Sequence, residues 1–542
     1  MKPGSYLFLF LLALPFFVAL DESALWDSNE AFYAQTPREM VERGEWVVPY
    51  FNGEPRLNKP PLSYWIVAAF YKLFSISIFW ERLPMAALAY GSVLVLFRIG
   101  KLLFDEQAAL WGAGIFATTF RFLILARRYF IEILLLFCIL AVIACFLAWL
   151  KRGRKGDFLL CSLFLGLAFL AKGPVILIAP GFLGLYLALT GRLKILRRAP
   201  WLAGFLIFGA VSSFWFVLLG VQAGWQPVAD FFLVENLGRF TSVDFGPRRG
   251  SFYYAGALLG DFFPWSFLFL AALVWWFRRE RPAEKAAQDP VLLLLIWIGA
   301  YILVFSLSFN KQEHYILPVY PAASLLVALY LCKARPASWL LALAGASSAA
   351  AAVLFFLISR QLFPEEAGLW VLPLLAAFLP VFLLGRRFGA SILLLALLYF
   401  AAFNLYLEPM RQYQPVPYFA DTIRDRSAHD EACRAGYYRY AAPSLSFYLN
   451  RPILALERQE QAVEALNSET PVFLIVPAED FPALQEAVSK PLEIIESRPK
   501  LNTTARTLIS ALQRGQTGPV EWARLLYLIT NQKTSTETES RF

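Results

Sequence analysis

Three acidic residues lie beside apolar segments, where a charged side chain is costly. Asp27 and Glu30 stand three positions apart in "WDSNEAFYAQ" (26–35), a spacing that would place them on one face of a helix. Glu132 lies in the otherwise apolar stretch "IEILLLF" (131–137). Ionisable residues held near a membrane by apolar segments are functional candidates because their desolvation is expensive. We therefore consider these carboxylates as candidate site residues.

Each carboxylate also has a structural interpretation. Asp27 followed by Glu30 matches a capping box that would begin an interfacial helix ending near Arg43. Glu132 could pair with a neighbouring arginine at the membrane surface. The structural and chemical interpretations are compatible for the first pair, because a capping residue fixes the backbone beside a site.

Several basic residues lie in loops that we expect on the same side of the membrane as these acids, outside the cytoplasm. The positive-inside rule predicts few lysines and arginines there. The basic residues are Lys59, Lys172, Arg239, Arg248, Arg249, Lys311 and His314, with Tyr33 and Tyr315 as further candidates nearby. A single lysine of this kind is commonly an interfacial side chain with its ammonium group in water. Several on one face indicate an anionic ligand, and phosphate suits the charge-assisted hydrogen bonds of lysine and arginine. Two prolines after Lys59 prevent a helix from starting before Leu62 and would present this lysine on a rigid loop.

The elements that must position these residues are membrane-spanning helices. The chain has 542 residues, of which 58% are hydrophobic and only 16% charged, whereas about a quarter of the residues of soluble proteins are charged. Apolar runs of about 17–25 residues are the signal for spans. Thirteen such segments are expected, at 5–20, 83–104, 107–126, 132–150, 157–171, 174–190, 200–222, 253–277, 290–309, 315–332, 337–359, 369–385 and 388–407. The sequence predicts an all-α polytopic membrane domain.

Lysine and arginine in the short loops predict the orientation of this domain. Clusters such as "KRGRKGD" (151–157) and "GRLKILRR" (191–198) belong to alternate loops that we assign to the cytoplasmic side. An odd number of spans then places the loop 21–82, the loop 223–252 and the chain after 408 together outside the cytoplasm. We expect a multi-pass protein of the cell inner (plasma) membrane with an extracytoplasmic site.

The composition divides the chain into three parts. Residues 1–407 form the predicted transmembrane domain, and 408–530 are more polar. In this second part a strand-like run, "PVFLIVP" (471–477), precedes a helical one, "EDFPALQEAV" (479–488), which predicts a small α/β domain. The polar tail 531–542 has the composition of a disordered segment.

Several classes of site are excluded by the sequence. It contains no phosphate-cradling glycine loop, nucleophile elbow or dinucleotide fingerprint. His314 and His429 are its only histidines, which excludes a multi-histidine metal site, although carboxylates could still hold a divalent cation. The net charge of +9 is explained by the topology of the loops, so we expect no nucleic-acid partner.

The opening stretch resembles the first outer loop of the C-type glycosyltransferases that use polyprenyl-phosphate sugars. These are the protein O-mannosyltransferase superfamily and its bacterial branch, the aminoarabinose transferases that modify lipid A. The resemblance rests on the acidic pair, "FYAQTPREM" (32–40), "GEWVVP" (44–49), "NKPPLSYW" (58–65), Glu132, "AKGP" (171–174), "FFLVENLGRF" (231–240), "RRGSFYYAGALLGDFFPWS" (248–266) and "SFNKQEHYILPVYPA" (308–322). The chain departs from the family at Asn29, where the family usually has an aspartate before Glu30. The base would then be Asp27 or Glu132.

The resemblance implies a membrane glycosyltransferase that moves a sugar from a polyprenyl phosphate to a lipid A-like lipid or another envelope acceptor, with inversion. The implied catalytic residues are Asp27, Glu30 and Glu132, and the implied ligands of the donor phosphate are Lys59, Lys172, Arg248 and Arg249. Its partners would be the polyprenyl-phosphate-linked sugar, a lipid or protein acceptor and membrane lipids.

Two alternative functions are carried forward. Within the enzyme class, the acceptor could be a serine or threonine of a protein. A transporter or flippase for a lipid-linked anion would use the same basic face, but it predicts inverted repeats and ionisable residues deep within several spans. The acids of this sequence gather instead at one end of the predicted spans.

Overall fold

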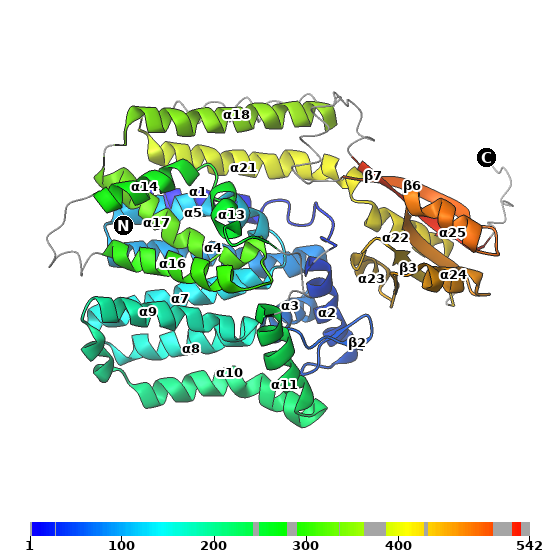
Figure 1. Ribbon diagram of the computed structural model, residues 1–542, viewed down its shortest axis with the longest axis horizontal. Coiled ribbons are helices and arrows are strands. Elements are labelled where there is room, and N and C mark those ends of the chain that lie inside the picture. Colours follow the sequence, from blue (N-terminus) through cyan, green and yellow to red (C-terminus); the bar gives the residue numbers. More distant parts are fainter. Residues whose placement is uncertain are drawn as a thin grey trace.

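A computed structural model describes residues 3–27, 29–241, 249–278, 290–334, 336–362, 386–427, 432–501 and 523–532. In this part of the chain, a bundle of apolar helices carries a small sheet domain at one end (Figure 1).

The long helices of the bundle are apolar enough to cross a membrane. Six qualify among the described residues, namely α4 (Ile78–Leu103), α7 (Ile131–Arg152), α10 (Trp201–Ala223), α16 (Pro290–Leu307), α18 (Ser338–Leu362) and α21 (Phe388–Met410). Two bent pairs raise the number to as many as eight, and they are α5 (Glu106–Ala117) with α6 (Phe120–Ala126) and α13 (Tyr253–Asp261) with α14 (Ser266–Arg278). The chain is therefore a multi-pass membrane protein.

Shorter helices occupy most of the remaining segments that we expected to span. They are α1 (Pro3–Phe17), α8 (Lys155–Lys172), η1 (Pro174–Leu177) with α9 (Ile178–Leu189), and α17 (Val319–Lys333). The expected span at 369–385 lies outside the described residues. Because several of these helices are short or bent, thirteen remains a predicted number of spans.

Helix α7 is the most enclosed of the six long apolar helices. Within its most apolar stretch, 83% of the residues are buried, compared with 28% for α10. It packs against α4 and α8. The residue that opens its first turn, Glu132, is therefore held by a rigid interior element.

Short elements gather at one end of the bundle. They include α2 (Asn29–Arg43), the hairpin of β1 (Tyr50–Phe51) and β2 (Glu54–Pro55), α3 (Leu62–Leu73) and α11 (Gln226–Phe232), and the sheet domain lies at this end too (Figure 1). The connection between α9 and α10 lies at the opposite end (Figure 1). Helix α2 confirms the expected helix ending near Arg43, and α3 begins at Leu62 directly after the two prolines.

The C-terminal domain is built on a five-stranded mixed sheet. Its strands are β3 (Arg434–Tyr438), β4 (Leu454–Leu456), β5 (Val472–Pro477), β6 (Glu493–Leu501) and β7 (Ala523–Thr530), in the order β4-β3-β5-β7-β6. Its helices are α22 (Pro415–Arg426), α23 (Ser444–Leu449), α24 (Gln459–Asn467) and α25 (Phe481–Ala487). The predicted strand and helix are confirmed as β5 and α25. The exact domain limits and the tail from 533 onward stay predictions.

Candidate active site

Glu132 is the acidic centre of the most distinctive polar cluster. Its side chain is buried, and its Oε1 atom lies 2.8 Å from Lys172 Nζ and 3.2 Å from His314 Nε2. Its Oε2 atom is also buried but receives no hydrogen bond from the described residues. Three segments far apart in sequence thus meet at one carboxylate, which keeps one oxygen available to a substrate.

Lys172 is placed by the break between α8 and η1. Gly173 follows it with φ of 78°, and a Cβ atom there would lie 2.9 Å from the Phe231 ring, so this position requires glycine. The Lys172 ammonium also lies 4.6 Å from the centre of the Tyr315 ring. The lysine is therefore held between the carboxylate of Glu132 and an aromatic face.

A cavity of about 450 Å³ adjoins this cluster. Its polar lining comprises Asn58, Lys59, Lys172, Glu235, Asn236, Arg239, Ser308, Asn310 and Tyr315. Lys172 and Tyr315 also line the small recess around Glu132, so they connect the two spaces. The cavity wall includes η3 (Leu233–Gly238), a π-helical turn of a kind found often at functional sites. The predicted cations Lys59, Lys172 and Arg239 therefore converge.

The charges around Lys59 favour binding of an anion. Its ammonium donates to the Asn58 carbonyl at 2.9 Å. Burial, together with the positive charges of Arg239 and Lys172, lowers the pKa of Lys59 to about 7. Glu235 neutralises part of this charge, because it pairs with Arg239 at 2.8 Å. An entering phosphate would relieve the repulsion between the cations and raise the pKa of Lys59 again.

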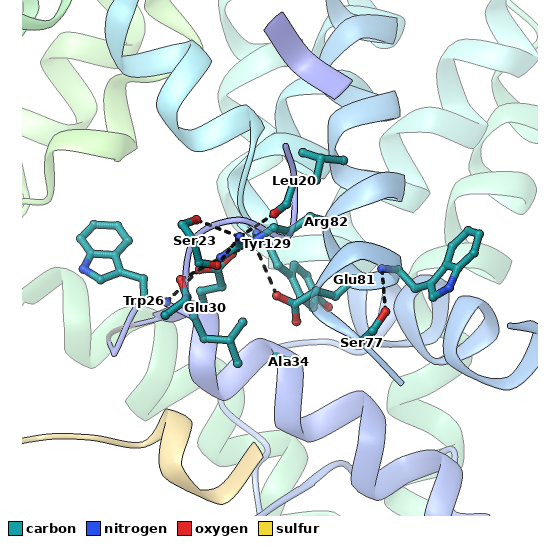
Figure 2. Close-up of polar contacts among 12 residues, drawn as sticks. Leu20, Ser23, Trp26, Glu30, Ala34, Ser77, Glu81, Arg82 and Tyr129 are labelled. Carbon is teal, nitrogen blue, oxygen red and sulfur yellow. Dashed lines mark hydrogen bonds and ion pairs between the residues drawn. The ribbon is translucent and has the colours of Figure 1, made fainter. Parts of the chain in front are cut away.

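Glu30 occupies a different environment. Arg82, at the start of α4, donates to both of its oxygens at 2.8 and 2.9 Å, and the backbone N–H groups of Trp26 and Tyr129 donate at 2.9 and 3.1 Å (Figure 2). Arg82 donates further to the carbonyl oxygens of Leu20, Ser23 and Ala24. Burial opposes ionisation, but the charge and hydrogen bonds of Arg82 hold the pKa of Glu30 below its usual range. The side chain is completely buried and every lone pair direction is in use.

Arg82 was missed by sequence reasoning, although a signal was present. An arginine at the outer end of a predicted span opposes the expected distribution of positive charge, as Lys59 does. Arg82 fastens the chain after α1 to α2 and α4, and Glu30 in turn holds the Tyr129 backbone just before Glu132. We therefore interpret Glu30 as a positioning residue for the loop that leads into α7.

Asp27 faces the C-terminal domain. Its Oδ1 atom accepts hydrogen bonds from the Ser444 hydroxyl and, at 3.1 Å, from the Ser444 backbone N–H at the start of α23. Neither hydrogen bond of the predicted capping box is found among the described residues, because Asp27 accepts from Ser444 and Glu30 accepts from the Trp26 N–H and not from that of Asp27. Burial raises the pKa of Asp27 despite the bonds from Ser444. The structure does not bring Asp27 into contact with Glu132, and its role as a base stays a prediction.

The other predicted site residues, Tyr33, Lys311, Arg249 and Arg248, have different surroundings. Tyr33 is buried, and burial together with the charge of Glu132 raises the pKa of Tyr33. Lys311 donates to a backbone carbonyl 2.6 Å away. Arg249 pairs with Glu313 at 2.8 Å. Arg248 lies outside the described residues.

A metal centre finds no support in the described part of the chain. No group of three or more histidine, cysteine, aspartate or glutamate side chains there could hold an ion. The two partners of Glu132 are a lysine and a histidine, which already supply its compensating hydrogen bonds. The suggestion of a divalent cation therefore remains without a candidate site in these residues.

Comparison with known proteins identifies relatives of this chain. Residues 58–216 match the family model of dolichyl-phosphate-mannose-protein mannosyltransferase. An uncharacterized protein of Aquifex aeolicus (strain VF5) is 32% identical over 310 residues, covering 57% of this chain and 68% of that protein. The undecaprenyl phosphate-alpha-4-amino-4-deoxy-L-arabinose arabinosyl transferase of Yersinia enterocolitica is 26% identical over 366 residues. The alignment covers 60% of this chain and 59% of the Yersinia protein, so the chain spans about three fifths of that relative.

A solved structure shares the fold. The crystal structure of ArnT from Cupriavidus metallidurans bound to undecaprenyl phosphate superposes with a TM-score of 0.75 at 20% identity, and all of both chains is covered. Because the two sequences are only 20% identical, this likeness shows a shared fold and nothing further. It includes both the helical bundle and the small sheet domain.

Proposed function

The chain belongs to the C-type glycosyltransferases that use polyprenyl-phosphate sugars, and from this premise we propose that the cluster around Glu132 is its transfer site. One observation carries the proposal. A buried carboxylate with one unengaged oxygen adjoins a cavity in which three cations converge. A proton acceptor and an anion-binding wall are the two parts that transfer from a phosphate-linked donor requires.

The proposed reaction is a single displacement with inversion. The donor phosphate binds in the cavity against Lys59, Arg239 and Lys172. An acceptor hydroxyl, or a phosphate oxygen, attacks the anomeric carbon as its proton, when it carries one, passes to Glu132 Oε2. The bond between the anomeric carbon and the phosphate oxygen breaks, and its electron pair leaves with the polyprenyl phosphate. The fixed cations stabilise this leaving group, so no strong general acid is needed.

His314 and Lys172 have a second role in this reaction. Both contact Glu132 Oε1, which leaves Oε2 as the oxygen that can receive a proton. Lys172 also lines the donor cavity, so it links the carboxylate to the leaving phosphate. As Glu132 becomes protonated, Lys172 is released from charge compensation just when the phosphate gains charge.

We propose a lipid of the cell envelope as the acceptor and the outer face of the inner membrane as the place of transfer. The name of the Yersinia relative, an undecaprenyl phosphate-aminodeoxyarabinose arabinosyl transferase, supports a lipid-linked donor. The gathering of α2, α3, α11 and the sheet domain at one end of the bundle supports a single extramembrane face (Figure 1). Transfer to serine or threonine of a protein remains the alternative. We retain 1–407 and 408–530 as the limits of the two domains.

Mass spectrometry of envelope lipids and glycoproteins tests the proposal. Three strains are compared, carrying the wild-type chain, the Glu132→Gln chain or no chain. We expect a lipid carrying one additional sugar only with the wild-type chain. The same additional sugar on serine or threonine peptides would favour the protein acceptor. Identical lipids and glycoproteins in all three strains would contradict transfer.

A further inference from the structure

A short turn carries two of the residues that contact the pair of Glu132 and Lys172. This turn is η4 (Glu313–Ile316), a 3-10 helix that precedes α17. Its His314 Nε2 atom lies 3.2 Å from Glu132 Oε1. The centre of its Tyr315 ring lies 4.6 Å from the Lys172 ammonium. The position of η4 therefore sets how far the imidazole stands from the proposed proton acceptor.

A turn of this kind gives its own side chains limited support. The hydrogen-bond geometry of a 3-10 helix is poorer than that of an α-helix, and such helices are short. Backbone bonds of 3.1 Å join η4 to its flanking residues, from the Tyr315 N–H to the Gln312 carbonyl and from the Leu317 N–H to the His314 carbonyl. The place of His314 relative to Glu132 thus depends on contacts between η4 and neighbouring elements.

The first two residues of α13 make such contacts. The Tyr253 hydroxyl donates to Glu313 Oε1 at 2.5 Å. The Tyr254 hydroxyl accepts from the backbone N–H of Gln312, just before the turn, at 3.2 Å, and this tyrosine is completely buried. Two adjacent tyrosines therefore bind the turn, one at a side chain and one at the backbone.

Arg249 completes the contacts of Glu313. Its guanidinium donates to Glu313 Oε1 at 2.8 Å and to the Tyr253 hydroxyl, and it lies 4.5 Å from the centre of the Tyr253 ring. Burial opposes ionisation of Glu313, but the hydrogen bond from Tyr253 and the charge of Arg249 lower its pKa. Glu313 is therefore an ionised anchor for the turn at neutral pH.

Helix α13 is itself fixed at its far end. Asp261, its last residue, accepts two hydrogen bonds of 2.9 Å from the Arg121 guanidinium on α6. The Tyr320 hydroxyl on α17 donates to the same carboxylate at 3.2 Å. Pairing of both carboxylate oxygens with one guanidinium adds geometric definition to the ion pair. Helix α13 thus connects the bundle at one end to η4 at the other.

We propose that Tyr253, Glu313 and Arg249 are positioning residues, which hold His314 against Glu132 without touching the substrates. The proposal rests on the proposed function, because the place of His314 matters only if Glu132 accepts the proton. A carboxylate that is held at Oε1 presents Oε2 in one direction. Displacing a reacting group by about 1 Å can slow a reaction by about a hundredfold, so contacts behind the imidazole act on the rate.

This assignment gives Arg249 a role other than the one that the family resemblance implies, which is contact with the donor phosphate. Its guanidinium is engaged by the carboxylate of Glu313 and by the face of Tyr253. Arg249 is not among the described residues that line the cavity around Lys59. An arginine bound in this way stabilises the ionised form of Glu313.

Rates of sugar transfer in double-mutant cycles test the positioning role. Purified chains are added to membranes of the strain that lacks the chain, which supply the cell's own donor and acceptor. Mass spectrometry follows the additional sugar on envelope lipids and glycoproteins. The variants are Tyr253→Phe, Glu313→Gln and His314→Gln, and each of the first two is also combined with the third. Tyr90→Phe is the matched control, because the Tyr90 hydroxyl donates instead to the Leu9 carbonyl, at 2.9 Å.

We expect Tyr253→Phe and Glu313→Gln each to slow transfer by about three- to tenfold, no more than His314→Gln does. In the His314→Gln background each should slow transfer by less than about twofold, because the imidazole that they position is gone. Tyr90→Phe should transfer at the rate of its parent in both backgrounds. Losses that multiply fully in the double variants would overturn the proposal, since the residues would then act independently of His314. A wild-type rate in both single variants would overturn it too.

Glu132→Gln in the same assay separates this proposal from the proposed function. A wild-type rate in that variant would overturn both, because Glu132 would not be the proton acceptor. A slow Glu132→Gln chain together with fully multiplied losses in the double variants would overturn the positioning role alone.

Binding of undecaprenyl phosphate in detergent separates positioning from donor binding. We expect Arg249→Gln and Tyr253→Phe to bind it with wild-type affinity. Weaker binding by Arg249→Gln would return Arg249 to the donor phosphate and overturn its positioning role. Thermal unfolding of Tyr253→Phe should match that of Tyr90→Phe, because each variant loses one hydroxyl and keeps its ring, and all rates are compared at equal amounts of folded protein.

Discussion

Glu30 and Glu132 are both buried glutamates paired with a cation, yet their surroundings differ in a way that separates structure from chemistry. Glu30 has both oxygens bonded to Arg82 and two backbone donors besides. Glu132 has one oxygen held by Lys172 and His314 and the other without a donor among the described residues. The first carboxylate is saturated, whereas the second is held at one atom and available at the other.

The identity of the cation explains much of this difference. The planar fork of an arginine satisfies both oxygens of a carboxylate, but a lysine ammonium is a point charge that approaches one of them. Lys172 can therefore neutralise Glu132 without occupying it fully. Removing a partner from the saturated pair should destabilise the fold, and changing the unsaturated carboxylate should slow the reaction.

Breaking the saturated pair should have the largest effect on stability. We expect Glu30→Gln to lower the free energy of unfolding by about 3–5 kcal/mol, because the buried Arg82 then keeps only the more distant Glu81, 3.9 Å away, as an acidic neighbour among the described residues. Thermal unfolding in detergent measures this loss. Glu42→Gln is the control, since Glu42 pairs with Arg38 on the surface and should cost less than about 1 kcal/mol. A Glu30→Gln chain as stable as the control but inactive would return Glu30 to the catalytic residues.

Changing Lys59 should affect use of the donor. We expect Lys59→Ala to lower kcat/KM for the donor by about 10- to 150-fold, the loss of a hydrogen bond to a charged group. The pKa of Lys59 is lowered to about 7, and only its protonated form binds phosphate well, so the wild-type kcat/KM should fall as pH rises through about 7. Lys59→Arg keeps the charge and should hold kcat/KM level above that pH. A profile that falls identically in Lys59→Arg would contradict the assignment.

Removing one of the two partners of Glu132 should have a smaller effect on the rate of transfer. His314→Gln removes the imidazole that lies 3.2 Å from Glu132 Oε1. We expect kcat to fall by about tenfold, corresponding to one charge-assisted hydrogen bond, while KM for the donor stays near its wild-type value. Steady-state kinetics separates the two constants. A change confined to KM would show that His314 contacts the donor and does not position the carboxylate.

Asp27→Asn should have the smallest effect of these substitutions. The asparagine oxygen can still accept both bonds from Ser444, so we expect transfer to change by less than about threefold. Because the pKa of Asp27 is raised in the folded protein, its ionised form costs stability as pH rises, and the variant should be slightly more stable than wild type at pH 8. Transfer rates and thermal unfolding at pH 6 and 8 check both points. Complete loss of transfer would make Asp27 the base.

The sequence predicted the parts of this site better than their arrangement. Glu132 was recognisable because burying a lone acid in an apolar segment is costly unless the acid has a function. Lys59 was recognisable because its loop carries two prolines and a positive charge that topology does not explain. The expected spans 157–171 and 174–190 placed Lys172 in the short connection between two helices, and the structure confirms that α8 ends there and η1 begins at Pro174. The pairing of Lys172 with Glu132 depends on how α7 and α8 pack, which a linear pattern does not contain.

Asp27 shows why the acids could not be sorted from sequence alone. Its partner, Ser444, lies 417 positions away in another domain. A three-residue spacing with Glu30 predicts a shared helix face, but Asp27 precedes the helix and faces away from it. The number of spans could not be predicted from apolar runs either. Within single runs, α5 and α6 meet at a bend of 66°, and α13 and α14 at a bend of 116°.

The most direct test of the account is single-turnover transfer by the Glu132→Gln chain with the donor already bound. Purified wild-type, Glu132→Gln and Glu30→Gln chains are compared at equal amounts of folded protein, and affinity for undecaprenyl phosphate is measured beside the rate. The account predicts that Glu132→Gln binds undecaprenyl phosphate as wild type does and transfers sugar about 10²- to 10⁴-fold more slowly, while folded Glu30→Gln keeps most of its rate. A wild-type rate in Glu132→Gln would contradict it.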